Sequence, residues 1–208
     1  MNAFTKRGEI AGPAGLLSVA VDTTTDLPSR GLAVFCHPHP LQGGTMDNKV
    51  VTTVARGLMQ RGWRVVRFNY RGVGASQGTW DEGRGEVDDA LAVIAAHRAA
   101  GEPLVLGGFS FGGYIALSAA MKLPEAERPR RLVLVAPSTV KHEAPPATAA
   151  AADTLLIHGE ADDVVPLAAS LDWARPQAVP VVVVPGAGHF FHGQLPLLKS
   201  LVLRHFAE

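Results

Sequence analysis

The chain has 208 residues, and its 19 lysine and arginine side chains balance its 19 aspartate and glutamate side chains. This length suits one compact domain over residues 1–208, and the absence of a basic run interleaved with aromatic residues argues against nucleic-acid binding. The start has no signal-peptide pattern and no run of about 18 apolar residues occurs, so we expect a cytoplasmic protein without membrane contact. The single cysteine, Cys36, excludes an internal disulfide and fits a reducing compartment.

Short apolar runs rich in β-branched residues recur along the chain and predict strands. They cover residues 16–21, 32–36, 64–70, 104–106, 132–135, 155–157 and 181–184. Between them lie helix candidates at residues 48–61, 82–99, 111–123, 166–174 and 192–206. Strands that alternate with helices indicate an α/β fold, with a mostly parallel sheet of about seven or eight strands and helices on both faces. The first strand is expected to run antiparallel, because only a loop separates it from the next strand.

Residues 107–113 read Gly-Gly-Phe-Ser-Phe-Gly-Gly, which places Ser110 at the centre of a Gly-x-Ser-x-Gly pattern. A predicted strand precedes this pattern and a predicted helix follows it. Glycines two residues either side of a serine allow a sharp strand-to-helix turn that exposes the hydroxyl group. Ser110 is therefore the candidate nucleophile.

A serine hydroxyl is a weak nucleophile at neutral pH and needs a base, which in turn needs a group that orients it. In open α/β sheets such groups stand at the carboxyl ends of strands. Asp162 follows the strand predicted at 155–157, and His189 follows the strand predicted at 181–184 on a glycine-rich turn. Their order after Ser110, acid and then histidine, is that of α/β-hydrolases.

Neighbouring residues compete for these two roles. Asp163 stands next to Asp162 as a second candidate for the acid. His192, three residues after His189, is a second candidate for the base. His158, at the end of its strand, is expected to support the turn structurally rather than to act as the base.

Several motifs carry a resemblance to a known family. They are His-Pro-His-Pro-Leu-Gln-Gly-Gly at residues 37–44, Phe-Asn-Tyr-Arg-Gly-Val-Gly-Ala-Ser at 68–76, the pattern around Ser110, the loop of Asp162 and Gly-His-Phe-Phe at 188–191. Across about residues 31–192 the chain resembles the α/β-hydrolase superfamily, and within it the small lidless bacterial hydrolases of the dienelactone-hydrolase-like type. The resemblance implies Ser110 as nucleophile, Asp162 as acid and His189 as base.

Many hydrolases of this type carry a lid in the interval between the strands predicted at 132–135 and 155–157. Here that interval contains residues 144–152, which are mainly alanine and proline and are expected to form a loop. The loop is too short for a lid domain. We therefore expect no lid and, where this loop lies beside the site, a site open to solvent.

Acyl transfer also needs N–H donors for the oxyanion, commonly one after the nucleophile and one from a loop after an earlier strand. The first is the backbone N–H of Phe111. In the earlier loop Pro38 and Pro40 have no N–H. This leaves His39 or Leu41, and position in the loop favours His39.

Other hypotheses compete with a serine hydrolase. His37 and His39, together with His189 and His192, are the ligands that a metal-dependent hydrolase would use, although the prolines and the assignment of His189 to the triad argue against it. The glycine-rich run at 72–78 resembles a dinucleotide loop, but its third glycine is one residue late, and a tight turn is preferred. A third hypothesis is a catalytically idle scaffold that binds a ligand or a partner.

The sequence therefore predicts a serine hydrolase that cleaves a small acyl substrate, in the first place a carboxylic ester, through an acyl-enzyme on Ser110. No metal and no organic cofactor are expected, and the expected partner is the small-molecule acyl substrate. Esters, thioesters, lactones, amides and peptides share this machinery, so the sequence does not choose among them. It also leaves open a homodimer in which a second subunit covers the lidless site.

Overall fold

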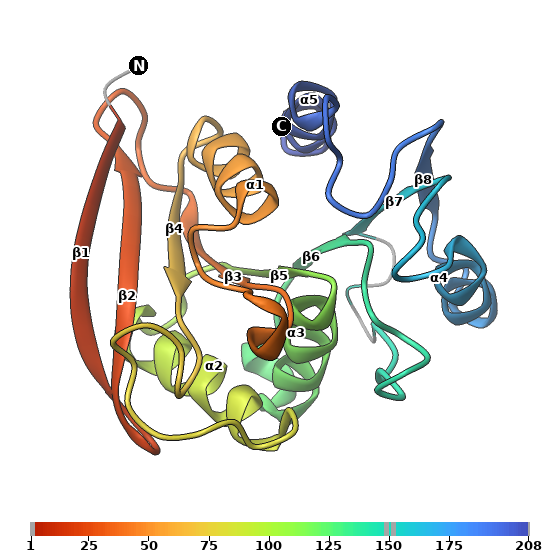
Figure 1. The fold of residues 1–208 in the computed structure, drawn as a ribbon. Helices are drawn as coiled ribbons and strands as arrows, with labels where there is room; N and C mark the ends of the chain where they lie inside the picture. Colours follow the sequence, from red (N-terminus) through yellow and green to blue (C-terminus); the bar gives the residue numbers. More distant parts are fainter. Residues whose placement is uncertain (1–2, 148–149, 151–152, 208) are drawn as a thin grey trace.

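The computed structural model describes residues 3–147, 150 and 153–207, and in this part of the chain the strands form one eight-stranded sheet (Figure 1). The strands are β1 (Ala3–Gly12), β2 (Gly15–Thr24), β3 (Gly31–Cys36), β4 (Trp63–Phe68), β5 (Leu104–Phe109), β6 (Arg131–Val135), β7 (Thr154–Gly159) and β8 (Val181–Val184). Their order across the sheet is β1-β2-β4-β3-β5-β6-β7-β8. From β4 to β8 all neighbours are parallel, whereas β2 is antiparallel to β1 and β4. The mostly parallel sheet and the antiparallel first predicted strand, which is β2, are confirmed.

The edge strand β1 is not among the strands that the sequence predicts, because it has no continuous apolar run. Polar residues such as Thr5, Lys6 and Arg7 fill its centre, and these side chains are exposed. Its position comes instead from a tight hairpin with β2, in which Gly12 pairs with Gly15. Apolar periodicity predicts strands that are covered on at least one face, so it does not detect a largely solvated edge strand.

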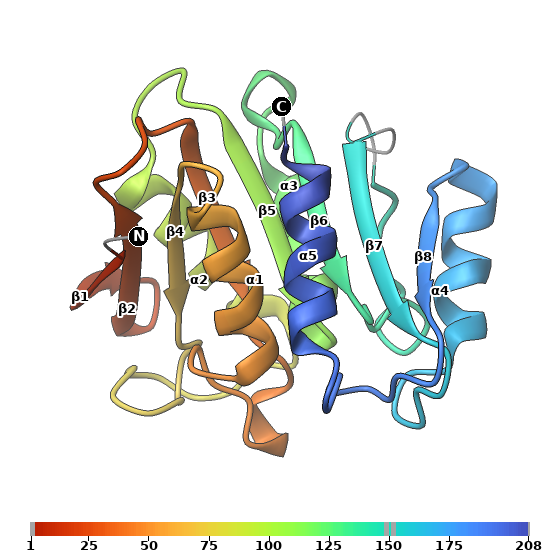
Figure 2. The same cartoon turned by 90° about the horizontal axis from the view of Figure 1, so that it is seen from above.

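Helices cover both faces of the sheet. They are α1 (Lys49–Met59), α2 (Arg84–His97), α3 (Phe111–Lys122), α4 (Leu167–Ala174) and α5 (Leu195–His205). Figure 2 shows α1 and α5 side by side on one face, and α2 and α3 lie on the other face, as expected for this fold. Within the described ranges, no helix combines the length and the apolar character that crossing a membrane requires.

Two apolar clusters, one on each face, explain why the inner strands read as continuous apolar runs. In β3 the side chains of Leu32, Val34 and Cys36 belong to the cluster that includes α2 and α3. Ala33 and Phe35, between them, belong to the cluster that includes α1 and α5. Successive side chains of a strand point to opposite faces, so both faces of β3 are apolar. Cys36 is buried, and burial raises the pKa of its thiol to about 12.

Two helices begin later than the sequence indicates, because residues with positive φ stand before them. Glu82 and Gly83 have φ of 55° and 94° before α2. Phe191 and Gly193 have φ of 51° and 75° before α5. A right-handed helix cannot include such residues, so His192 lies in a turn rather than in α5.

The described part of the alanine- and proline-rich segment packs against the region of α4 instead of forming a lid. The indole N–H of Trp173 donates to the carbonyl oxygens of Ala144 and Pro145 at 3.3 and 3.1 Å. The N–H of Ala147 donates to Oε1 of Gln177 at 2.6 Å. Residues 148, 149, 151 and 152, which also belong to the predicted loop, lie outside the described residues.

Candidate active site

Ser110 lies at the sharp turn between β5 and α3, where the sequence predicts a nucleophile. Its backbone has φ 56° and ψ −119°, a conformation that residues with a Cβ rarely adopt. The flanking glycines are required by close backbone approach. A Cβ at Gly108 would lie 2.1 Å from Gly112, and a Cβ at Gly112 would lie 2.3 Å from the carbonyl oxygen of Cys36. The turn is also held by a hydrogen bond of 2.9 Å from the Ser110 N–H to the carbonyl oxygen of Val135.

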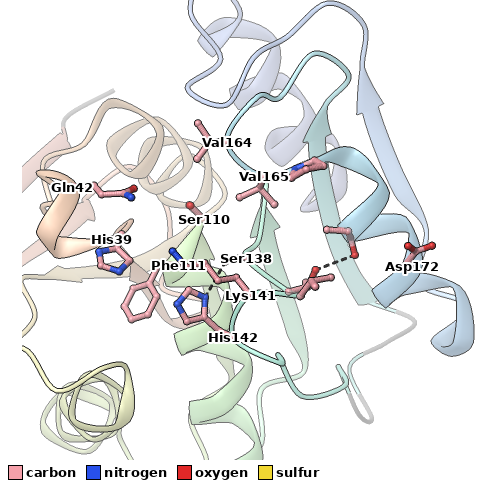
Figure 3. A pocket seen from close by; sticks show the side chains of 14 residues that line it. His39, Gln42, Ser110, Phe111, Ser138, Lys141, His142, Val164, Val165 and Asp172 are labelled. Atoms are coloured by element: carbon pink, nitrogen blue, oxygen red, sulfur yellow. Dashed lines mark hydrogen bonds between the residues drawn. The ribbon is translucent and has the colours of Figure 1, made fainter.

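A cleft of about 470 Å³ opens at the carboxyl end of the sheet, and Ser110, 8% exposed, lies on its wall (Figure 3). Its other walls come from separate loops. His39 follows β3, Phe111 belongs to the turn after β5, residues 138–142 follow β6, and residues 164–166 follow β7. The cleft has the volume of a small-molecule site, and the open end of the parallel strands is where such sites form.

Asp162 and His189 come together from the loops after β7 and β8. Nδ1 of His189 donates to Oδ2 of Asp162 at 2.7 Å, and both side chains are buried. Because a carboxylate only accepts, Nδ1 carries the hydrogen, and Nε2 of the neutral ring is left as an acceptor. A general base needs such an unprotonated ring nitrogen.

The ring of His189 lies next to the nucleophile turn. It packs against Phe109, the residue before Ser110, with 4.8 Å between the ring centroids. No hydrogen bond joins the Ser110 hydroxyl to His189 among the described residues. Hydrogen bonds of this kind are often long in a free enzyme and tighten when substrate binds. The missing hydrogen bond is therefore compatible with Nε2 of His189 acting on Ser110.

The carboxylate of Asp162 is buried, but hydrogen bonds support its charge. Oδ1 accepts from the N–H groups of Val164 and Val165 at 2.9 and 2.8 Å. Oδ2, which accepts from His189, also lies 3.3 Å from Nε2 of His158. Burial by itself would raise the pKa of Asp162, but the hydrogen bonds from His158, His189 and Val165 outweigh burial and hold this pKa below its usual range.

The two rivals for these roles lie outside this arrangement. Asp163 is exposed although it is next to Asp162. His192 is also exposed, and its ring contacts Phe190, with 5.9 Å between the ring centroids. His158 is fully buried and supports the turn as expected, with its Nε2 donating to a turn carbonyl at 2.8 Å. Its additional contact with Asp162 is not foreseen from the sequence.

Two backbone N–H groups at the cleft are available to a ligand. Both Phe111 and His39 line the cleft, and in the described part of the chain neither N–H donates to another protein group. The carbonyl oxygen of His39 accepts from Gln42 and Gly44 at 3.1 Å each, which closes the turn around the short helix η1 (Pro40–Gln42). Leu41, the alternative to His39, is 69% exposed.

The side chain of His39 forms an aromatic wall of the cleft. Its ring centroid lies 4.8 Å from that of Trp80 and 5.1 Å from that of Phe111. Burial, with a smaller contribution from the positive charge of Lys141, lowers the pKa of His39. This shift favours the neutral form of the ring.

His37 lies behind this loop, and both of its ring nitrogens are occupied. Nδ1 donates to the carbonyl oxygen of Pro38 at 2.7 Å, and Nε2 accepts from the N–H of Tyr70 at 3.2 Å. Burial lowers the pKa of His37 to about 3. Among the described residues no group of three or more His, Cys, Asp or Glu side chains is arranged to hold a metal ion. The four histidines of the metal hypothesis are thus not brought together as ligands.

The glycine-rich run at 72–78 forms a tight turn after β4. The N–H of Gly72 donates to the carbonyl oxygen of Gln77 at 3.1 Å, and the N–H of Ser76 donates to that of Val73 at 3.0 Å. The next helix, α2, begins only at Arg84. A dinucleotide loop opens directly into a helix, so the geometry supports a plain turn.

The loop after β6 supplies cleft residues that no motif marks. Ser138 and His142 are joined by a hydrogen bond of 3.0 Å between Oγ and Nδ1, and the ring of His142 stacks on Tyr114. Lys141 lies between them in sequence and also lines the cleft. Only its position after the carboxyl end of a predicted strand could have indicated a role for this loop.

Comparisons with known proteins agree with this fold. Residues 28–154 match the family model described as "Serine aminopeptidase, S33". An α/β serine hydrolase homologue from Coxiella burnetii is 39% identical, with a TM-score of 0.85 and coverage of 96% of each chain. An α/β serine hydrolase without lid from Xanthomonas campestris is 38% identical, with a TM-score of 0.85 over 98% of this chain and 94% of that chain.

A relative among the curated proteins shares a shorter region. An uncharacterized protein from Rickettsia prowazekii is 40% identical over 117 residues, which are 55% of this chain and 49% of that protein. The chain thus spans about half the length of this relative. The structural matches, by contrast, cover nearly the whole fold, including the eight-stranded sheet.

Proposed function

We propose that this chain, which belongs to the serine aminopeptidase family of α/β-hydrolases, is a serine esterase that cleaves small carboxylic esters. The observation that carries the proposal is the strained turn of Ser110. It directs a serine into an open cleft beside the hydrogen-bonded pair of Asp162 and His189. Backbone strain of this kind persists where the surrounding structure enforces it, and such sites are commonly functional.

In the proposed mechanism Oγ of Ser110 attacks the ester carbonyl carbon while Nε2 of His189 takes the hydroxyl proton. Asp162 holds the imidazole in this tautomer and stabilises its positive form. The tetrahedral intermediate collapses by breaking the bond between the carbonyl carbon and the alcohol oxygen, and the alcohol leaves with the proton from His189. Water then attacks the acyl-enzyme with His189 again as base, and the carboxylic acid is released.

The carbonyl oxygen carries a negative charge in both tetrahedral intermediates. We assign the backbone N–H groups of Phe111 and His39 to this oxygen, because they line the cleft with Ser110 and donate to no other protein group within the described residues. Donors of this type are typically worth about 100- to 1,000-fold in turnover. No metal and no organic cofactor enters these steps.

The family description makes peptide cleavage after a free amino terminus the second candidate function. The ammonium group of such a substrate would need a carboxylate in the cleft. The carboxylate that lines it, Asp172, pairs with Arg175 at 2.7 Å, whereas Lys141 has no carboxylate at ion-pair distance in the described part of the chain. An uncompensated positive charge disfavours an ammonium group, and we therefore favour the ester.

A fluorophosphonate probe tests the nucleophile directly. We expect intact-mass analysis to show one adduct per chain, and peptide mapping to place it on Ser110. The Ser110→Ala variant is the matched control and should not be labelled. Folded protein that does not react, or an adduct on another residue, would contradict the proposal and favour an idle scaffold.

A set of four substrates tests the choice of ester over peptide. The propionyl and alanyl derivatives of one chromogenic alcohol, and of the matching aniline, differ only in the amino group or in the scissile bond. We expect the propionyl ester to have the highest kcat/KM. Preference for the alanyl anilide would make the aminopeptidase the better assignment.

A further inference from the structure

A second imidazole contacts the carboxylate that we place in the triad. His158 stands near the end of β7, is fully buried, and has its Nε2 3.3 Å from Oδ2 of Asp162. The same oxygen accepts from Nδ1 of His189 at 2.7 Å. Asp162 is thus held by two histidines, of which the proposed mechanism uses one.

The partners of His158 fix which of its ring nitrogens carries the hydrogen. Nε2 lies 2.8 Å from the carbonyl oxygen of Val165, which can only accept, so Nε2 is the donor. Nδ1 lies 2.8 Å from Oγ of Ser170, a buried residue on α4. In the neutral ring Nδ1 accepts from this hydroxyl group. Nε2–H therefore donates to the Val165 carbonyl oxygen, and Oδ2 of Asp162 lies farther from the same nitrogen, at 3.3 Å.

With this contact, N–H groups surround both oxygens of the Asp162 carboxylate. Oδ1 accepts from the N–H groups of Val164 and Val165, and Oδ2 accepts from His189 and lies within reach of His158. A carboxylate offers about four lone-pair sites, of which three accept hydrogen bonds and the fourth faces the longer contact with His158. A buried carboxylate held in this way has one preferred orientation and stays ionised.

From this arrangement we propose that His158 is a positioning residue, whose Nε2–H keeps Oδ2 of Asp162 oriented toward Nδ1 of His189. The inference rests on the proposed roles of Asp162 and His189 in ester hydrolysis. Without this contact, Oδ2 is held by His189 alone, so the carboxylate orients the imidazole less firmly and the ring is held less strictly in one tautomer. His158 touches neither the cleft nor the nucleophile among the described contacts, so its effect passes through Asp162.

A purely structural role for His158 is the competing explanation. Its bonds to Val165 and Ser170 join β7, the turn after it and α4, and these bonds alone would justify a buried histidine. Two amide substitutions separate the roles. The side chain of Gln is long enough to place an N–H near the position of Nε2, which serves Asp162. The shorter Asn reaches the position of Nδ1, which serves Ser170.

We would compare His158→Gln and His158→Asn with the wild type in three measurements. These are kcat/KM for one ester across pH, the low-field proton resonance of Nδ1–H in His189, and the melting temperature. We expect His158→Gln to keep kcat/KM within about threefold and to keep the resonance. We expect His158→Asn to lose roughly 10- to 100-fold, the range set by a hydrogen bond to a charged group, and to shift or lose the resonance.

The variant Ser170→Ala keeps the experiment decisive where His158→Asn does not fold. It leaves the ring in place but removes the hydroxyl group that anchors Nδ1, so the ring is held only through Nε2 and we expect the same changes at smaller size. The positioning role is wrong if losses in both amide variants only follow their melting temperatures, or if the resonance of His189 is unchanged in all three. A resonance that responds as expected in a protein without esterase activity would uphold the inference and contradict the proposed function.

Discussion

The two halves of the candidate site differ in how well their polar groups are satisfied. On the acid and base side, both oxygens of Asp162 accept hydrogen bonds, three in all, and the pair with His189 is buried. On the nucleophile side, Ser110 has a strained backbone, and the N–H groups of Phe111 and His39 donate to no other protein group in the described ranges. The polar groups of Asp162 thus have their partners without substrate, whereas the nucleophile side keeps N–H donors without a protein acceptor in the described part of the chain.

This difference follows from what each half has to do in the proposed reaction. The carboxylate must keep one charge in one orientation through every step, which favours a saturated and buried environment. The nucleophile turn must offer free donors to an oxygen that becomes negative only during reaction. We therefore expect substitutions on the nucleophile side to affect activity and stability in opposite directions, and those on the acid side to affect both alike.

The largest effect on activity should come from Ser110. We expect Ser110→Ala to lower turnover of an ester by at least about 10,000-fold, because the acyl-enzyme cannot form. Ser110→Gly should be equally inactive but should melt at a higher temperature than Ser110→Ala. Glycine adopts φ 56° without strain, and strain at such a residue costs about 1–3 kcal/mol. Turnover assays and calorimetry of the two variants check this.

The pair of Ser110 variants also tests the comparison itself. A Ser110→Gly protein that melts below Ser110→Ala would mean that the turn is not strained. Wild-type turnover in either variant would remove Ser110 from the mechanism.

The next effect should come from the acid. Asp162→Asn should lower kcat by about 10,000-fold, because an amide favours the wrong tautomer of His189. Asp163→Asn is the matched control, with the same chemical change one residue away on an exposed side chain, and should stay near wild type. Kinetics of the two variants on one ester decide between the carboxylates. If Asp163→Asn is the damaging substitution, the acid lies elsewhere than the geometry places it.

The adjacent aspartates also show where sequence reasoning ends. The turn around Ser110 could be predicted because its glycines, its strand and its helix all lie within about 20 residues of one another, and close backbone approach dictates the glycines. The choice of Asp162 over Asp163 depends on which side chain faces the N–H groups of Val164 and Val165. That orientation is a property of one turn and has no periodic signal.

Other features could not be predicted from the sequence, for a similar reason. The contact between His158 and Asp162 joins residues four apart through a turn, which looks like ordinary structural support until both side chains are placed. The cleft wall at residues 138–142 belongs to no motif, because residues of a surface loop follow no periodic pattern of the fold. The parallel sheet itself was predictable, because strands buried on both faces are apolar throughout.

A smaller effect should appear in the dependence of stability on pH. The pKa of Asp162 is lowered in the folded protein, so its ionised form stabilises the fold fully above the unfolded pKa of about 3.9. This contribution is lost as the pH falls below that value toward the folded pKa. Urea unfolding at pH 5.5 and pH 3 should show a larger loss for wild type than for Asp162→Asn. Equal losses would mean that Asp162 carries no stabilised charge.

The smallest effect should concern substrate charge. Lys141 lines the cleft, and its positive charge helps to lower the pKa of His39 and His142, in both cases after the larger effect of burial. We expect Lys141→Glu to raise kcat/KM for an alanyl ester relative to the propionyl ester of the same alcohol by roughly fivefold, a modest ratio because the side chain is solvated. Lys6→Glu makes the same charge change on the edge strand β1 and should leave the ratio unchanged.

A change of equal size in the kcat/KM ratio of both variants would show that net charge, and not the cleft, sets the preference. A change in the kcat/KM ratio that is confined to Lys141→Glu would place the ammonium group of the alanyl ester against the loop after β6. The nucleophile side of the site would then contain, besides the free oxyanion donors, a charged side chain that selects the charge of the substrate.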